Sequence, residues 1–315
     1  MSTLDQAART IDAAATNVAD KPAPRRPQLG DMWWRHVVGI LAVVFALFPV
    51  AYIVSAAFSV DGTLTGASLI PRALTLDNFR TILGGTINVA GADNDIPYLR
   101  WYANTVIVAT ATAITTVLAG ALAAYAFSRF RFKGRRLGML GLLLIQMFPQ
   151  LLLVVAIYLI MLNTGNVFSF IGLNTLTGLT IVYLGGALGV NTWLLKGFFD
   201  TIPAELDESA RVDGATPAQV FWGVVLPLAV PVLAVVGLFS FVATLNEFVI
   251  ASVLLQDRDS FTLPLGLLSY IDKQYAEQWG PFCAGVLLAA LPVALLFAFL
   301  QRFIVGGLTQ GSVKG

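Results

Sequence analysis

The chain has 315 residues, of which 57% are hydrophobic and 12% are charged. Soluble domains carry about 25% charged residues, so this composition excludes an ordinary soluble globular enzyme. Nineteen basic and eighteen acidic residues leave a net charge of +1, which gives no basic surplus for nucleic acid. A single Cys and a single His exclude a disulfide framework and a His/Cys metal site. The composition therefore predicts a polytopic membrane protein.

Six apolar stretches are long enough to cross a bilayer, whose hydrocarbon core of about 30 Å requires roughly 20 apolar residues per helix. They are residues 37–60, 101–127, 137–162, 178–195, 224–246 and 282–301. The third and fourth are separated at 163–166 and 172–175, where clustered Asn, Gly and Thr are typical of turns. A β-barrel is the structural alternative, but barrel strands alternate apolar and polar residues, and these stretches do not. We therefore expect an all-α membrane protein with six transmembrane helices.

Basic residues next to the apolar stretches predict the orientation, because cytoplasmic loops are enriched in Lys and Arg. Residues 129–136, between the second and third stretches, contain five basic residues and no acid. Placing them inside puts both termini in the cytoplasm, with fourteen basic residues inside and five outside. Segments 61–100 and 256–281 then face the opposite side.

The division of the chain follows from the same pattern. Residues 1–36 are polar and Pro-rich, and we expect them to form a flexible cytoplasmic tail. A signal peptide is the competing interpretation, but the apolar segment that follows has 24 residues, longer than the 7–15 of a signal sequence. Residues 37–305 would form the transmembrane domain, and residues 306–315 a cytoplasmic C-terminal tail.

The loop at 200–219 predicts two short helices joined by a turn. Acidic residues after Pro203 favour the positive end of a helix dipole, and Gly214 suits the left-handed position that follows a helix end. We expect Gly214 to have a positive φ. An ordinary amphipathic surface loop is the alternative on these features alone.

The same loop also carries a spaced pattern. It reads Glu208-Ser209-Ala210, three residues, Gly214, nine residues, Val224, one residue, and Leu226-Pro227. The pattern resembles the Glu-Ala-Ala loop of permease subunits in binding-protein-dependent ABC importers, with Ser for the central Ala and Val for Ile. The resemblance is stronger to the second, shorter permease of maltose/maltodextrin importers, and it extends from about residue 41 to the C-terminus. It is carried by residues 146–149, 170–175, 183–186, 213–217 and 307–315, and the long N-terminal tail departs from it.

This resemblance implies a type I ABC importer permease fold and a set of contacts with a cytoplasmic ATPase. In the loop, Glu208 would make a polar contact, Ser209 and Ala210 would allow close packing, and Gly214 would form the bend. The tail of the family also contacts the ATPase pair, and the corresponding residues here are Thr309, Gln310, Gly311, Ser312, Val313, Lys314 and Gly315. The expected partners are a homologous longer permease, an ATPase homodimer, an external or periplasmic sugar-binding protein and the lipid bilayer.

The chain contains no Gly-Lys-Ser/Thr sequence, so we expect no bound nucleotide, no catalytic residue and no metal site of its own. ATP and Mg²⁺ would be bound by the partner ATPase. Glu247 is the one acid expected at membrane depth, where a charge indicates a pathway or gate role unless it reaches the outer interface.

The predicted function is half of a translocation pathway for maltose, maltodextrin or a related α-glucoside across the cytoplasmic (inner) membrane. A self-contained secondary transporter or channel is the alternative from another class. Such carriers usually place several ionisable groups or unwound helices near the midplane, and here only Glu247 is available. An intramembrane enzyme is a third interpretation, and it lacks a nucleophile with a base. Among α-glucosides, the sequence leaves the choice open.

Overall fold

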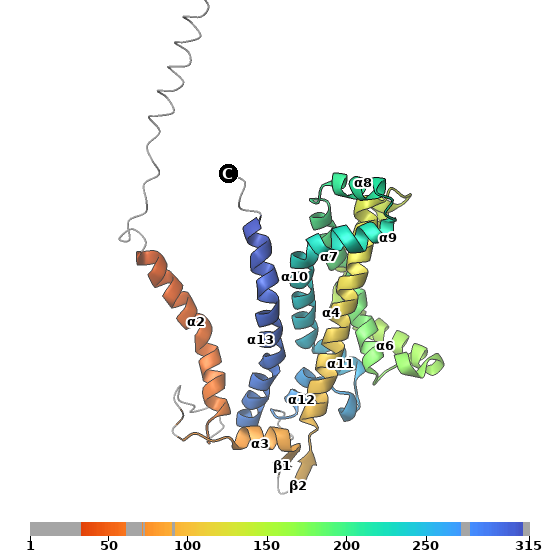
Figure 1. Ribbon diagram of the computed structural model, residues 1–315. Coiled ribbons are helices and arrows are strands. Elements are labelled where there is room, and N and C mark those ends of the chain that lie inside the picture. The colour runs from red at the N-terminus through yellow and green to blue at the C-terminus, as the bar shows by residue number, and fades with distance from the viewer. Residues whose placement is uncertain (1–32, 61–70, 72, 90–91, 272–277, 311–315) are drawn as a thin grey trace, which may run out of the picture. The chain divides into compact units, whose positions relative to one another are not determined.

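A computed structural model, shown in Figure 1, describes residues 33–60, 71, 73–89, 92–271 and 278–310. The chain divides into two units, residues 1–51 and 52–315, which are described separately. The greater part of the predicted N-terminal tail and the last five residues lie outside the described residues.

Among the described residues, five helical segments are long and apolar enough to cross a membrane. They are α2 (Trp33–Ala57), α4 (Tyr98–Arg129), α7 (Leu176–Phe199), the run Pro217–Leu245, and α13 (Trp279–Gln310). A sixth span is formed if the bent pair α5 (Arg135–Met147) and α6 (Gln150–Val167) is counted as one. The pair bends by 103°. Pro149 lies at this bend, where its missing N–H and fixed φ interrupt a helix. Counted in this way, the structure contains the six predicted spans, and α5 and α6 together form the third, which is broken.

Helix α2 is apolar on all sides. In the first unit its residues 33–51 are exposed, and Phe45 is 84% exposed. A helix without a polar face is suited to lipid and not to water. The described part of the first unit therefore has the composition of a membrane-spanning helix.

The core of the second unit is formed by α4, α7 and α10 (Leu226–Leu245), which pack against one another along their lengths. Ala121 and Ala124 of α4 lie fully buried against Leu195 of α7 and Ala229 of α10. Small residues allow membrane helices to approach closely and gain dispersion contacts. This three-helix core positions both regions described below as candidate sites.

Two short helices precede α10, as the sequence predicts. They are α8 (Ala204–Val212) and α9 (Pro217–Val220), and a π-helical turn at Phe221–Val225 continues α9 into α10. Figure 1 shows α8 and α9 at one end of the bundle, with α3 and the β-hairpin at the other end.

That other end contains structure that the sequence analysis did not predict. A short helix, α3 (Asp77–Gly84), leads into an antiparallel hairpin of β1 (Thr86–Val89) and β2 (Ala92–Asp95), with Thr86 opposite Asp95. Thr, Ile and Val favour extended backbone, and Gly85, at φ 73°, ends α3 and turns the chain into β1. The expected all-α fold is therefore correct for the spans and incomplete for this loop. Helix α11 (Val249–Leu254) precedes the segment 256–281, which contains a 3-10 turn at Arg258–Ser260 and helix α12 (Leu263–Leu268).

The turn predicted at 163–166 is wrong, because α6 continues to Val167. Asn163 donates a hydrogen bond from Nδ2 to the carbonyl of Leu159, 2.9 Å away, so its amide is satisfied within the helix. The turn predicted at 172–175 agrees with the structure, in which the break between α6 and α7 lies at 168–175. There Asn174 has φ 58°, and the Thr175 hydroxyl caps α7 by accepting from the N–H of Gly178.

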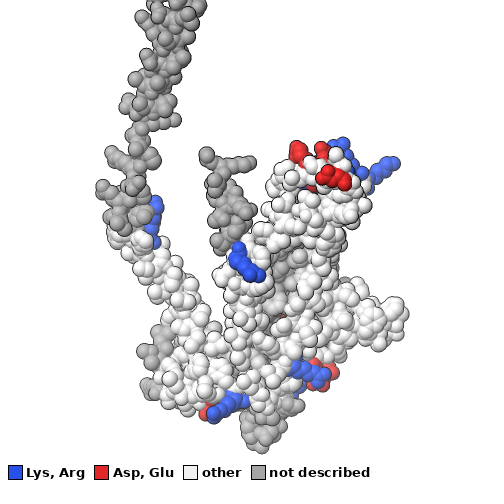
Figure 2. Space-filling view, viewed as in Figure 1, with Lys and Arg blue, Asp and Glu red and all other residues white. Residues whose placement is uncertain are grey.

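Charged side chains of the second unit gather at its two ends. Figure 2 shows acidic and basic groups over α8 and α9, a second group at the end that contains α3, and a mostly white surface between them. This distribution is typical of a protein whose middle lies in hydrocarbon and whose ends lie in water.

Candidate functional site: a two-helix loop and a cavity in the spans

A buried ion pair fixes the loop of α8 and α9 to the end of α4. The Arg129 Nε atom lies 2.8 Å from Oδ2 of Asp207, and these side chains are 10% and 5% exposed. Arg129 also donates from Nη2 to the carbonyl oxygen of Ile202, 2.9 Å away. Both groups of a buried pair lose hydration, so either charge without the other is strongly destabilising. The pair therefore makes the position of α8 depend on α4.

Gly214 forms the bend between α8 and α9. Its φ of 86° confirms the predicted left-handed conformation. The Gly214 N–H donates to the carbonyl of Arg211, and the Ala215 N–H donates to that of Ala210, both at 3.0 Å. This pair of bonds is a Schellman motif, which satisfies the carbonyls left free at a helix end. Ala210 and Ala215 also pack against the same buried cluster, which completes the motif.

The next residues cap α9 directly. The Thr216 hydroxyl accepts from the Gln219 N–H, the Gln219 side chain accepts from the Thr216 N–H, and Pro217 occupies the first turn. This is a capping box, which satisfies two helix-end donors reciprocally. Because one helix cap follows the other with no intervening loop, α8 and α9 form a rigid unit.

The residues predicted to contact an ATPase fall on two faces of α8. Glu208 and Ser209 are exposed and share a face with Glu205 and Val212, and Val212 is 88% exposed. The Ser209 hydroxyl donates to the Glu205 carbonyl, 2.8 Å away. Ala210 is half-buried against the core of its own unit, so its small side chain serves packing within this chain.

The predicted tail contact lies largely beyond the described residues. Thr309 and Gln310 form the end of α13, whose backbone is helical beyond the boundary expected at 306. The other predicted tail residues, Gly311, Ser312, Val313, Lys314 and Gly315, are outside the described range.

Asp200, which follows α7, forms a second polar link between the spans. Its Oδ1 accepts from the Ser128 hydroxyl at 2.6 Å, and its Oδ2 forms an ion pair with Lys196. Partial burial raises the pKa of this carboxyl, but the hydrogen bonds from Lys196 and Ser128 together outweigh burial and lower it below its usual range. Asp200 is therefore an ionised contact at neutral pH.

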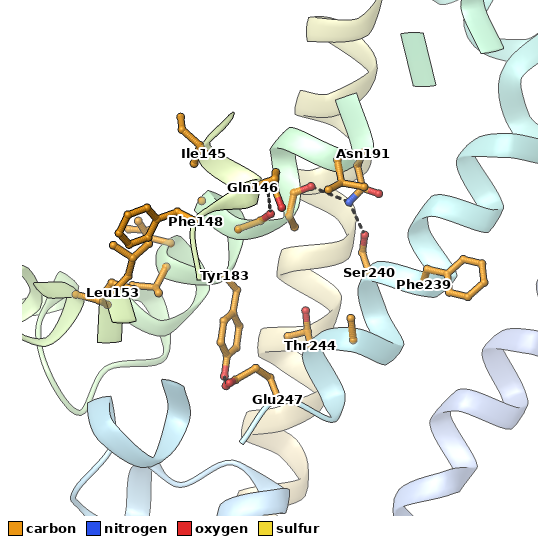
Figure 3. A pocket seen from close by; sticks show the side chains of 18 of the residues that line it. Ile145, Gln146, Phe148, Leu153, Tyr183, Asn191, Phe239, Ser240, Thr244 and Glu247 are labelled. Atoms are coloured by element: carbon orange, nitrogen blue, oxygen red, sulfur yellow. Dashed lines mark hydrogen bonds between the residues drawn. The ribbon is translucent and has the colours of Figure 1, made fainter. Parts of the chain in front are cut away.

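A cavity with a volume of about 720 Å³ is lined by α5, α6, α7 and α10. Figure 3 shows its side chains converging from these helices. Most of the lining is apolar, and the exceptions are Gln146, Tyr183, Asn191, Ser240, Thr244 and Glu247. An apolar cavity with a few placed polar groups is typical of a small-molecule site.

Glu247 holds one end of this cavity together. Its Oε2 accepts from the Tyr183 hydroxyl at 2.5 Å, and the two side chains point toward each other in Figure 3. Its two carboxylate oxygens also accept from the N–H groups of Ile250 and Ala251, at 2.8 and 3.1 Å. Glu247 thus caps the start of α11 while lining the cavity. The sequence analysis expected Glu247 in a pathway or at the outer interface, and it did not predict these three hydrogen bonds.

Two further polar links lie in the same wall. The Gln146 amide donates to the Gly186 carbonyl at 2.6 Å, and the Asn191 amide donates to the Ser240 hydroxyl at 3.3 Å. The sequence analysis did not assign these residues to a pathway. Polar residues inside apolar spans usually face a bundle interior or a cavity, and this signal was present in the sequence.

With this geometry in view, comparison with known proteins identifies the family. The model of the family described as "Binding-protein-dependent transport system inner membrane component" matches residues 116–309, more than half of the chain. The chain belongs to this family. It is thus a permease, a transport component in a family of multi-pass inner membrane proteins, and its matched region contains the two-helix loop and every polar residue of the cavity.

Curated relatives of this permease match along nearly their whole length. It is 40% identical over 289 residues to the maltose/maltodextrin transport system permease protein MalG of Vibrio vulnificus (strain YJ016), covering 90% of this chain and 96% of that protein. It is 40% identical over 295 residues to the protein of the same name from Escherichia coli (strain K12), covering 92% and 98%.

Solved structures support the fold. The permease resembles a chain of a bacterial ABC transporter involved in the import of the acidic polysaccharide alginate, with a TM-score of 0.70 and 23% identity. The match covers 89% of this chain and 99% of that chain. The type I ABC importer permease fold expected from the sequence is therefore confirmed.

Proposed function

We propose that this chain is one of the two permease subunits of an ATP-driven importer of maltose, maltodextrin or a related α-glucoside. The observation that carries the proposal is 40% identity, along about 90% of the chain, to proteins named as maltose/maltodextrin permeases. The resemblance of the loop to importer permeases, and of four stretches outside the loop to maltose/maltodextrin permeases, points in the same direction.

The cavity between α5, α6, α7 and α10 is this chain's half of the pathway, and a homologous longer permease completes it. Its polar groups suit the hydroxyls of a sugar, and its apolar groups suit the faces of the sugar rings. Transport follows alternating access, in which a change between two states exposes the cavity first outward and then inward. Glu247 is proposed as a gate residue, since it links the cavity wall to α11.

The rigid unit of α8 and α9 is the coupling element. A cytoplasmic ATPase dimer, which binds ATP and Mg²⁺, contacts the exposed face that contains Glu208, Ser209 and Val212. Because α8 is joined to α4 by a buried ion pair and to α10 through α9, movement of α8 is transmitted to the spans. The tail 309–315 is proposed as a second ATPase contact.

The end that contains α3 and α12 faces the sugar-binding protein outside, with both termini of the chain in the cytoplasm. This end is held firmly. Trp101 Nε1 donates to the Arg258 carbonyl at 2.7 Å, Asn104 donates to two further carbonyls of the same loop, and Asn174 Oδ1 accepts from Gln256 and Asp257. A docking platform of this kind loses little conformational entropy on binding.

Purification of the tagged chain from its own membranes tests the proposal. We expect an ATPase and a second permease to copurify, and we expect ATP hydrolysis in proteoliposomes to rise when the maltose-loaded binding protein is added. Retention of radiolabelled maltose, maltodextrin and trehalose by that binding protein identifies the sugar. Sugar uptake by liposomes that contain this chain alone would instead support the self-contained transporter.

A further inference from the structure

A second cavity, of about 660 Å³, lies between the start of α5 and the end of α7. Three of its lining residues are cationic, Arg135, Arg136 and Lys196, and no acidic residue lines it. Trp193 adds an indole to the wall. None of these residues belongs to the two-helix loop or to the larger cavity. The proposed function therefore leaves this cluster unexplained.

The cavity lies at the depth of lipid phosphate groups. Helix α7 has 24 residues and is therefore about 36 Å long, somewhat longer than the hydrocarbon core of about 30 Å. Its last turn contains Lys196, and a long cation at the end of a span is suited to the headgroup layer. Trp193 is 53% exposed one turn earlier, where indoles of membrane helices collect at the interface.

The charges in this cavity are only partly neutralised. Lys196 forms an ion pair with Asp200. Within the described residues, no carboxylate lies within ion-pair distance of Arg135 or Arg136, although the charge of Arg135 helps to lower the pKa of Asp200. Arg135 and Arg136 are consecutive in sequence, and each guanidinium offers a planar fork of N–H donors that fits phosphate oxygens. The uncapped start of α5 adds positive potential, and the end of α7 beside Lys196 adds negative potential.

We propose that this cavity binds the phosphate group of an anionic phospholipid of the surrounding leaflet, with Arg135, Arg136 and Lys196 as its ligands. Basic pockets between membrane helices on the cytoplasmic side commonly hold such headgroups. A bound lipid would connect α5, the first half of the broken span, to the end of α7. The broken span also lines the larger cavity, so the lipid would stabilise one wall of that cavity.

A role in membrane orientation alone is the simpler explanation of these basic residues, and the chain offers a matched control for it. Arg131 and Lys133 belong to the same basic run, are exposed and do not line the cavity. Replacing Arg131 and Lys133 by Gln, or Arg135 and Arg136 by Gln, removes two charges from this basic run in each case. Only the Arg135→Gln/Arg136→Gln pair changes the proposed site.

The experiment uses the full chain with the subunits that copurify with it, and native mass spectrometry counts bound lipids after exchange into mixed phosphatidylglycerol and phosphatidylcholine. We expect wild-type protein and Arg131→Gln/Lys133→Gln to retain phosphatidylglycerol in preference to phosphatidylcholine. Arg135→Gln/Arg136→Gln should retain it roughly tenfold less, the effect of losing a charge-assisted hydrogen bond. Arg136→Gln alone provides the same comparison if the double variant assembles poorly.

Two results would overturn the proposal. One is equal retention of phosphatidylglycerol by both double variants. The other is binding of inorganic phosphate to the delipidated complex through Arg135 and Arg136 without any lipid preference, which would assign the site to a soluble phosphate. Lipid retention is measured without transport or ATP hydrolysis, so its outcome is independent of the importer proposal.

Discussion

The two-helix loop and the larger cavity differ in how their structure is maintained. In the loop, consecutive bonds join neighbours in sequence: the Schellman bonds at Gly214, the capping box at Thr216 and the hydroxyl bond of Ser209. In the cavity wall, the bonds join residues far apart, such as Tyr183 with Glu247 and Asn191 with Ser240. The loop is thus rigid by itself, whereas the wall depends on the packing of several helices.

This difference suits the two proposed roles. A coupling element must transmit displacement without deforming, so dense local bonding is an advantage. A pathway wall must change between two states, which is easier when a few long-range bonds can break and reform. The bend of 103° between α5 and α6 lies in this wall.

The largest expected effect comes from breaking the buried ion pair that joins the loop to α4. Asp207→Leu leaves the Arg129 charge buried without a carboxylate, with only the Ile202 carbonyl as its acceptor, which costs about 3–5 kcal/mol. We expect α8 to detach from α4, so that binding-protein-stimulated ATP hydrolysis is lost while the spans still insert. Assembly by copurification and hydrolysis in proteoliposomes measure the two effects separately.

The matched control is the double variant Arg129→Met/Asp207→Leu, because replacing a whole buried pair by apolar residues is often neutral. It should recover assembly and much of the hydrolysis. If Asp207→Leu couples normally, the loop does not need its contact with α4, and the proposed route to the spans is wrong.

A smaller effect is expected in the cavity wall. Glu247→Ala removes the cap of α11 and leaves the buried Tyr183 hydroxyl unpaired, a loss of about 1–3 kcal/mol. Glu247→Gln retains an acceptor for Tyr183 and restores thermal stability. Sugar uptake then distinguishes the roles, because recovery with Gln indicates a structural residue, and continued loss indicates that the charge is needed in the pathway.

The bend at Gly214 tests the local rigidity of the loop. A Cβ at this position would meet no atom within 4 Å, so the cost of Gly214→Val arises from the left-handed backbone and is about 1 kcal/mol or more. Stimulated ATP hydrolysis should fall while copurification persists. Gly223→Val is the control, because its Cβ also meets open space and its φ is not positive. Equal activity of the two variants would remove Gly214 from the coupling mechanism.

The smallest effect is expected for Asp200→Asn, because the carboxylate is 42% exposed and such pairs contribute about 0–1 kcal/mol. The pKa of Asp200 is lowered on folding, so its contribution is present above the usual Asp pKa of about 3.9 and is lost as the pH falls through the lowered value. The melting temperatures of wild type and variant should therefore converge in acid. A constant difference across the pH range would assign the effect to packing.

Local features of the sequence predicted the spans and the turn of the loop, because both depend on residues that are neighbours in sequence. The spans follow from apolar length, because a bilayer accepts only helices with about 20 apolar residues. The bend at Gly214 and the start of α9 at Thr216-Pro217 follow from backbone preferences of single residues. The resemblance to the family also rests on short stretches of sequence, such as residues 208–214 of the loop, and the family membership is confirmed.

Tertiary structure decided what depends on residues distant in sequence. No local pattern indicates that Arg129 pairs with Asp207, that Glu247 meets Tyr183, or that Ala210 faces inward. The cavity beside Pro149 likewise requires the packing of α5 and α6 near α7 and α10. Sequence alone determined which segments enter the membrane and where the loop turns, because those are properties of neighbouring residues. The partners of each buried polar group were determined by which helices the folded chain places side by side.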